Sequence, residues 1–157
     1  MAEPLSEKVL AQIGKAEELY HRLILIAAPS GSGKTAALQD VATRTGAPLL
    51  NLNLEISRRL LDLTERQRAL QLPRVLEEVV GRDEPLVLLD NIEILFDVTL
   101  KQDPLRLLQG VSRNRTVVAA WNGTLENDYL SYATPEHPEH RRCPRRELVV
   151  VCPEVMA

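Results

Sequence analysis

The sequence predicts an α/β fold with a parallel sheet of about five strands between two layers of helices, a three-layer αβα arrangement. Short apolar runs, at 23–27, 86–90 and 116–120, alternate along the chain with longer helix-favouring stretches. Helices between such strands supply the crossovers that parallel pairing requires. In sheets of this kind the ligand binds at the carboxyl ends of the strands. We therefore looked for functional residues directly after each apolar run.

The composition bounds the class of protein. A chain of 157 residues predicts one domain, spanning 1–157. Its 22 acidic and 19 basic residues give no global attraction to DNA or an anionic membrane, so DNA contact is possible only through a local patch. No segment resembles a membrane span or a secretion signal, which predicts a cytoplasmic protein without membrane contact. The 3% aromatic content argues against a base-stacking surface.

The first half of the chain begins with a predicted amphipathic helix within residues 1–20, followed by the strand 23–27 and a helix that starts near Thr35. Residues 49–54 alternate apolar and polar side chains, as a strand would. Residues 56–81 predict one or two helices, with Pro73 marking the start of the second.

The second half predicts a buried strand at 86–90 that ends in Asp90. Asp103 and Pro104 form a cap and first turn for a short helix. After the strand 116–120, Asn122-Gly123 predicts a turn, and the proline-containing segment 124–146 predicts a long loop before the last strand at 147–151. We expect no lid domain after that strand.

Residues 28–35 read APSGSGKT, which is a P-loop with alanine at the usual first glycine. Gly31 and Gly33 let backbone N–H groups surround phosphates, Lys34 reaches the β and γ oxygens, and the Thr35 hydroxyl binds Mg²⁺. ATP and Mg²⁺ are the expected cofactors, because no Asn-Lys-x-Asp follows to select guanine. The expected nucleotide-binding residues are Pro29, Ser30, Gly31, Ser32, Gly33, Lys34, Thr35 and Ala36.

Asp90 matches a Walker B aspartate, which would hold Mg²⁺ with Thr35 if its strand lies beside the P-loop strand. The next residue is Asn91, whose amide cannot accept a proton from water. Glu93 either approaches the γ-phosphate or is a solvated loop carboxylate. Asn122 either contacts the γ-phosphate, as a sensor, or serves a hairpin turn. The candidate catalytic residues are Lys34, Asp90, Glu93 and Asn122.

Arginines gather before the last two predicted strands. One of them could reach a neighbouring subunit's nucleotide as an arginine finger, or these side chains could form a solvated basic loop or a DNA-backbone patch. The candidates for the finger are Arg113, Arg115, Arg141 and Arg142.

Beyond these motifs, the segments 52–60, 88–96, 103–109 and 112–116 resemble those of the BrxF family. BrxF is the small P-loop protein of type III BREX phage-defence systems. The resemblance implies a role in that defence and an AAA-like P-loop NTPase core, here without a C-terminal lid domain. It also implies partners encoded nearby: a larger ATPase, a methyltransferase and a phosphatase-like protein. Site residues transfer only at Lys34, Thr35 and Asp90.

Three functions remain open at this point. The first is an ATPase that is slow alone and completed by oligomerisation or by a BREX partner, because a core without a lid leaves the nucleotide exposed. The second is an ATP-dependent assembly switch with little turnover, which Asn91 favours. The third is a small-molecule kinase that uses the arginine-rich segment 141–146 as a lid.

Overall fold

The computed structural model describes residues 4–29, 31–81, 83–126, 129–132, 141–144 and 149–152. Its elements, in chain order, are α1 (Leu5–Ala16), β1 (Leu23–Ala28), α2 (Lys34–Thr45), β2 (Leu49–Asn51), α3 (Leu52–Leu60), α4 (Glu65–Val80), β3 (Leu86–Asp90), the 3-10 helices η1 (Ile92–Phe96) and η2 (Val98–Leu100), α5 (Pro104–Val111), β4 (Thr116–Glu126), β5 (Tyr129–Tyr132), β6 (Arg141–Pro144) and β7 (Val149–Val151).

The main sheet has the strand order β2-β3-β4-β1-β7, and every neighbouring pair along it is parallel. This confirms the α/β class with a mostly parallel sheet. One detail was wrong: β3, which carries Asp90, does not lie beside β1, because β4 is inserted between them. The β1–β4 ladder runs from the Leu23–Val117 pair to the Ala28–Asn122 pair.

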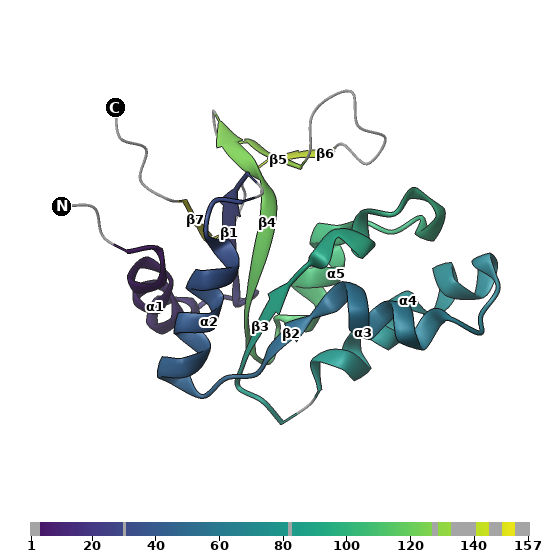
Figure 1. Cartoon of the computed structure of the whole chain (residues 1–157), viewed down its shortest axis with the longest axis horizontal. Coiled ribbons are helices and arrows are strands. Elements are labelled where there is room, and N and C mark those ends of the chain that lie inside the picture. Colours follow the sequence, from purple (N-terminus) through teal and green to yellow (C-terminus); the bar gives the residue numbers. More distant parts are fainter. Residues whose placement is uncertain are drawn as a thin grey trace.

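Helices cover both faces of the sheet, as predicted. Figure 1 shows α1 and α2 on one side and α3, α4 and α5 on the other. Successive residues of β1 point to opposite faces. Ile24 and Ile26 pack with α1 and α2, whereas Leu23 and Leu25 belong to the cluster under the other three helices. Since β1 is buried along its whole length, its near-continuous apolar sequence follows from its central place.

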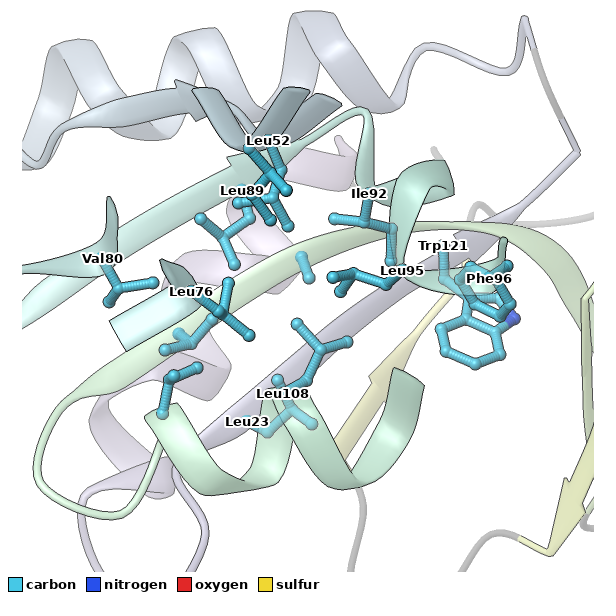
Figure 2. Packing of buried hydrophobic residues seen from close by; sticks show 14 of the residues in the cluster. Leu23, Leu52, Leu76, Val80, Leu89, Ile92, Leu95, Phe96, Leu108 and Trp121 are labelled. Carbon is cyan, nitrogen blue, oxygen red and sulfur yellow. The ribbon is translucent and has the colours of Figure 1, made fainter. Parts of the chain in front are cut away.

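The larger core cluster joins side chains from α3, α4, α5, both 3-10 helices and the strands β1, β3, β4 and β5; part of it is shown in Figure 2. One end of it is aromatic: the Phe96 and Tyr132 rings stack with centroids 3.5 Å apart, and Trp121 packs edge-on against both. The chain's only tryptophan and only phenylalanine lie in this group. Because Phe96 belongs to η1, Trp121 to β4 and Tyr132 to β5, aromatic packing ties these three elements together.

Two predictions after the fourth strand were wrong. β4 continues through Asn122 and Gly123 to Glu126, and within the predicted loop 124–146 β5 pairs antiparallel with β4 and β6 pairs with β5. The indole N–H of Trp121 donates to the Ser131 carbonyl at 2.9 Å. A Cβ at Gly123 would lie 1.7 Å from that oxygen. This glycine therefore permits a close approach between strands and does not form the expected Asn-Gly turn.

Helix boundaries also differ from prediction in the first half. α1 ends at Ala16, and β2 ends at Asn51, because the Asn51 side chain caps α3 by accepting from Leu54 N at 3.1 Å. α4 begins with a capping box formed by Thr64 and Gln67. Asn51, which we had predicted to lie within a strand, is thus the N-cap of α3.

We had predicted that Pro73 begins a helix. This was wrong, because Pro73 lies inside α4. A proline has no N–H to donate to the carbonyl four residues earlier, which here belongs to Ala69. Gln102 supplies the missing donor, since its Nε2 atom lies 2.7 Å from Ala69 O. The residue that follows η2 and Lys101 therefore compensates for the proline.

We predict that Gly123→Ala lowers the free energy of unfolding by about 2 kcal/mol or more, because the added Cβ forces β4 and β5 apart. Urea denaturation measures this. Gly110→Ala is the matched control: it lies in α5, a Cβ there meets no atom within 4 Å, and the substitution should stabilise the protein by roughly 0.5–1 kcal/mol. Equal effects at the two glycines would contradict this assignment.

Candidate functional site

The glycine-rich loop connects the carboxyl end of β1 to the first turn of α2. Gly31 and Gly33 have φ angles of 83° and 85°, in the left-handed region that side chains disfavour. A Cβ at either position would meet no atom within 4 Å, so dihedral angle and not space requires glycine here. Ser30 lies outside the described residues. The neighbouring Ser32 is exposed on the loop.

Lys34 is the first residue of α2, and its side chain folds back under the loop. Its ammonium donates to the carbonyl oxygens of Ala28 and Pro29, both at 2.7 Å, and the residue is only 6% exposed. Burial lowers the pKa of this ammonium, while the carboxylates of Asp90 and Glu93 act in the opposite direction. The buried ammonium of Lys34 thus lies at the base of the loop, near the carboxylates of Asp90 and Glu93.

Thr35 and Asp90 meet although their strands, β1 and β3, are not neighbours. The Thr35 hydroxyl donates to Asp90 Oδ2 at 2.7 Å, and the other carboxylate oxygen accepts from Asn91 N at 2.9 Å. The two oxygens suit a hard cation such as Mg²⁺, which commonly takes one or two protein oxygens and completes its shell with phosphate and water. Among the described residues, no group of three or more acidic, histidine or cysteine side chains is arranged to hold a metal ion.

Glu93 lies between two asparagine amides. Asn122 Nδ2 donates to Oε1 at 2.7 Å, and Asn53 Nδ2 lies 3.4 Å from Oε2. Asn91 makes this possible: its left-handed backbone, with φ 53°, turns the chain directly after Asp90. Asn122 therefore holds a carboxylate and does not form a hairpin turn.

Asn53 is a site residue that sequence reasoning missed. Its backbone N–H donates to Asn91 O at 2.9 Å, and its side-chain oxygen accepts from Ile94 N at 2.7 Å. These bonds fix the start of α3 against the turn after β3. We had read Asn53 as part of a strand, and only the Asn51 cap signal, an asparagine three residues before Leu54, could have placed it in the first turn of a helix.

The depression formed by these residues has a volume of about 220 Å³. It brings together seven predicted site residues. Gly31 and Gly33 belong to the loop, and Lys34, Thr35, Asp90, Glu93 and Asn122 come from α2, β3, η1 and β4. The full lining is Gly31, Gly33, Lys34, Thr35, Asp90, Asn91, Glu93 and Asn122. Pro29 contributes its carbonyl to Lys34, and Ala36 is exposed in the first turn of α2.

The candidate arginines lie elsewhere. Arg115 is buried, donates to Val111 O at 3.0 Å and has Glu77 at 3.8 Å, while Arg113 lies over the Tyr20 ring. Both precede β4 and are about 20 Å from Asn122 along that strand. A finger at Arg115 is unsupported, because its guanidinium is enclosed by its own subunit.

Two further candidates lie on β6. The Arg142 guanidinium is exposed and lies 4.1 Å from the centroid of the Tyr129 ring. Arg141 begins the strand, and its side chain is outside the described part of the structure. Of the four candidates, Arg142 is the one whose described side chain is both exposed and carried on the β4–β5–β6 extension beyond Asn122.

Comparisons with known proteins identify no relative: no protein-family model matches the chain, and neither does any curated protein. In the described part of the chain, no helix combines the length and apolar character needed to cross a membrane.

The lowered pKa of Lys34 predicts how stability changes in alkaline solution. The folded protein binds this proton less tightly than the unfolded chain, so the free energy of unfolding, relative to Lys34→Met, should rise as pH increases from the lowered pKa toward the ordinary value of 10.5. Urea unfolding of both proteins across that range measures the difference. A difference that falls with rising pH would show that the carbonyl acceptors outweigh the cost of burial.

Proposed function

We propose that this chain is an ATP-binding, Mg²⁺-dependent P-loop NTPase with an AAA-like core. The observation that carries the proposal is the hydrogen bond between Thr35 and Asp90, formed beside the buried Lys34 at the start of α2. A threonine hydroxyl, an aspartate and a lysine around a helix N-terminus are the groups that P-loop NTPases use for metal and phosphate.

The phosphates would bind at the start of α2. Gly33 is the N-cap of this twelve-residue helix and offers no side chain, so the first N–H groups can donate to an anion, and the helix dipole adds to the attraction. Lys34 would exchange the carbonyls of Ala28 and Pro29 for phosphate oxygens. Thr35 and Asp90 would hold Mg²⁺, which neutralises charge on the phosphates when bound.

Glu93 is the residue best placed to accept a proton from an attacking water. Two of its neighbours in the depression are amides, and a carboxylate has lone pairs to spare after accepting from Asn53 and Asn122. Asn91 cannot serve as the base. Each oxygen of Glu93 already accepts one amide N–H, which makes the carboxylate a weaker base. No described arginine lines the depression. We therefore propose that hydrolysis is slow and that oligomerisation or a partner accelerates it.

The biological setting we propose is type III BREX phage defence in the cytoplasm. Two of the four segments that resemble the BrxF family contribute to this site: 52–60 is α3, which carries Asn53, and 88–96 includes Asp90 and Glu93. Of these residues, only Asp90 transfers from the family as a site residue, whereas Asn53 and Glu93 are assigned from their contacts. Copies of the chain or other BREX proteins are the proposed partners.

A second candidate is an ATP-dependent assembly switch. The observation that favours it is Asn91, which stands directly after Asp90 and is turned by its positive φ into the lining of the depression. In this function ATP changes partner affinity, and turnover is incidental.

We expect Glu93→Gln to bind ATP as tightly as wild type but to release phosphate at least about 100-fold more slowly, because the amide cannot accept the proton. Phosphate release, measured over a range of protein concentrations, tests this. Glu78→Gln is the control, since that exposed carboxylate pairs with Arg74 on α4. Lys34→Ala should lose ATP binding.

Mass photometry on the same samples, with and without ATP, separates the two functions. Turnover that rises with protein concentration supports the oligomeric ATPase. No turnover, with ATP changing the assembly state, favours the switch. Wild type that binds no ATP, or Lys34→Ala that binds it equally well, would contradict the P-loop proposal.

A further inference from the structure

A second group of polar side chains lies at the opposite end of the sheet, where β1 and β4 begin. We refer to Tyr20, His21, Arg22, Arg113 and Arg115 as the amino-edge patch. The backbone brings its two segments together: Arg22 N donates to Ser112 O at 2.7 Å, and Val117 N donates to Arg22 O at 2.8 Å. The patch is about 20 Å from the depression along β4, so the proposed nucleotide site does not use it.

Tyr20 is an exposed aromatic side chain that its neighbours hold in place. It is 67% exposed, yet Arg113 lies 4.9 Å from its ring centroid, and His21 packs edge-on at 4.7 Å. His21 in turn is bonded through Nδ1 to the Gln109 carbonyl at 3.1 Å. Such bracing lowers the entropy lost when a flat ligand stacks on the ring.

The patch is locally cationic in an acidic protein. The segments 19–22 and 109–117 contain no acidic residue, and the exposed Glu17 and Glu18 come just before the first of them. Glu77 contacts Arg115 at 3.8 Å, and the acidic residues Asp83 and Glu84 lie on the β3 side of β4, away from β1. In the described structure no acidic side chain pairs with Arg22 or Arg113, so their charges are not neutralised beside the tyrosine.

Two arginines of the patch are short of acceptors. Within the described structure, the buried Nε atoms of Arg22 and Arg115 have no hydrogen-bond partner. Arg115 is 7% exposed and directs one terminal nitrogen to Val111 O. Buried donors without acceptors are uncommon in folded proteins. An anion bound near the starts of β1 and β4 would stabilise these two arginine side chains electrostatically.

We propose that the amino-edge patch binds single-stranded nucleic acid, with one base stacked on Tyr20 and flanking phosphates on Arg22 and Arg113. An exposed aromatic ring beside cations is the combination by which single strands are held without sequence preference. A phosphorylated peptide would use the arginines but gives no role to the ring. The low aromatic content argues against an extended surface. Of the two described tyrosines that lie beside an arginine, Tyr20 is the more exposed.

The test is fluorescence anisotropy with a short labelled poly-dT strand at low salt. Tyr20→Leu should weaken binding about tenfold, whereas Tyr20→Phe, which keeps the ring, should bind as wild type does. Arg113→Gln should weaken binding and reduce the slope of log K against log salt by about 0.7. Tyr129→Leu is the matched control, because Tyr129 is the other exposed tyrosine covered by an arginine.

Binding that Tyr20→Leu weakens and Tyr129→Leu leaves unchanged supports the proposal, and Lys34→Ala should bind the strand normally. Absence of binding by wild type at low salt would overturn it. So would equal loss in Tyr20→Leu and Tyr129→Leu, or a phosphorylated peptide that binds more tightly than the strand. Because the strand is tested without ATP, failure here leaves the nucleotide proposal untouched.

Discussion

The parallel pairing of β1 with β4 determines where both polar sites of the molecule lie. At the carboxyl end of this ladder Ala28 lies opposite Asn122, which puts the glycine-rich loop beside the amide that holds Glu93. At the amino end Leu23 lies opposite Val117, which brings the two halves of the amino-edge patch together. Since β1 is buried along its length, hydrophobic burial and a continuous hydrogen-bond ladder hold both sites.

The packing of η1 against the core fixes the position of Glu93 relative to the sheet. Ile92, Leu95 and Phe96 are buried around it, so the intervening Glu93 has no freedom to drift away from Asn122. Phe96 is in turn stacked on Tyr132 of β5. The β4–β5–β6 extension therefore supports the catalytic carboxylate of the proposed enzyme through the core, although its strands lie beyond the parallel sheet.

Local signals predicted the parts of the fold and site that depend on neighbouring residues. The loop glycines, the strand that ends in Asp90 and the helix capped by Asp103 were all found, because each is specified within a few residues. What escaped prediction depends on distant contacts.

Three positions show the limit. Gly123 looked like a turn residue, and only the path of the Trp121 side chain to Ser131 explains its place in a strand. Pro73 looked like a helix start, and Gln102 compensates for it inside α4. Asn53 gained its role only when α3 and the turn after β3 came together.

The most direct test of the central claim is a crystal structure with Mg²⁺ and a non-hydrolysable ATP analogue. We expect the triphosphate at the start of α2, with Lys34 Nζ moved from the Ala28 and Pro29 carbonyls to phosphate oxygens and with Thr35 and Asp90 at the metal. A nucleotide bound elsewhere, or a nucleotide at the loop with Lys34 still on those carbonyls, would contradict the account.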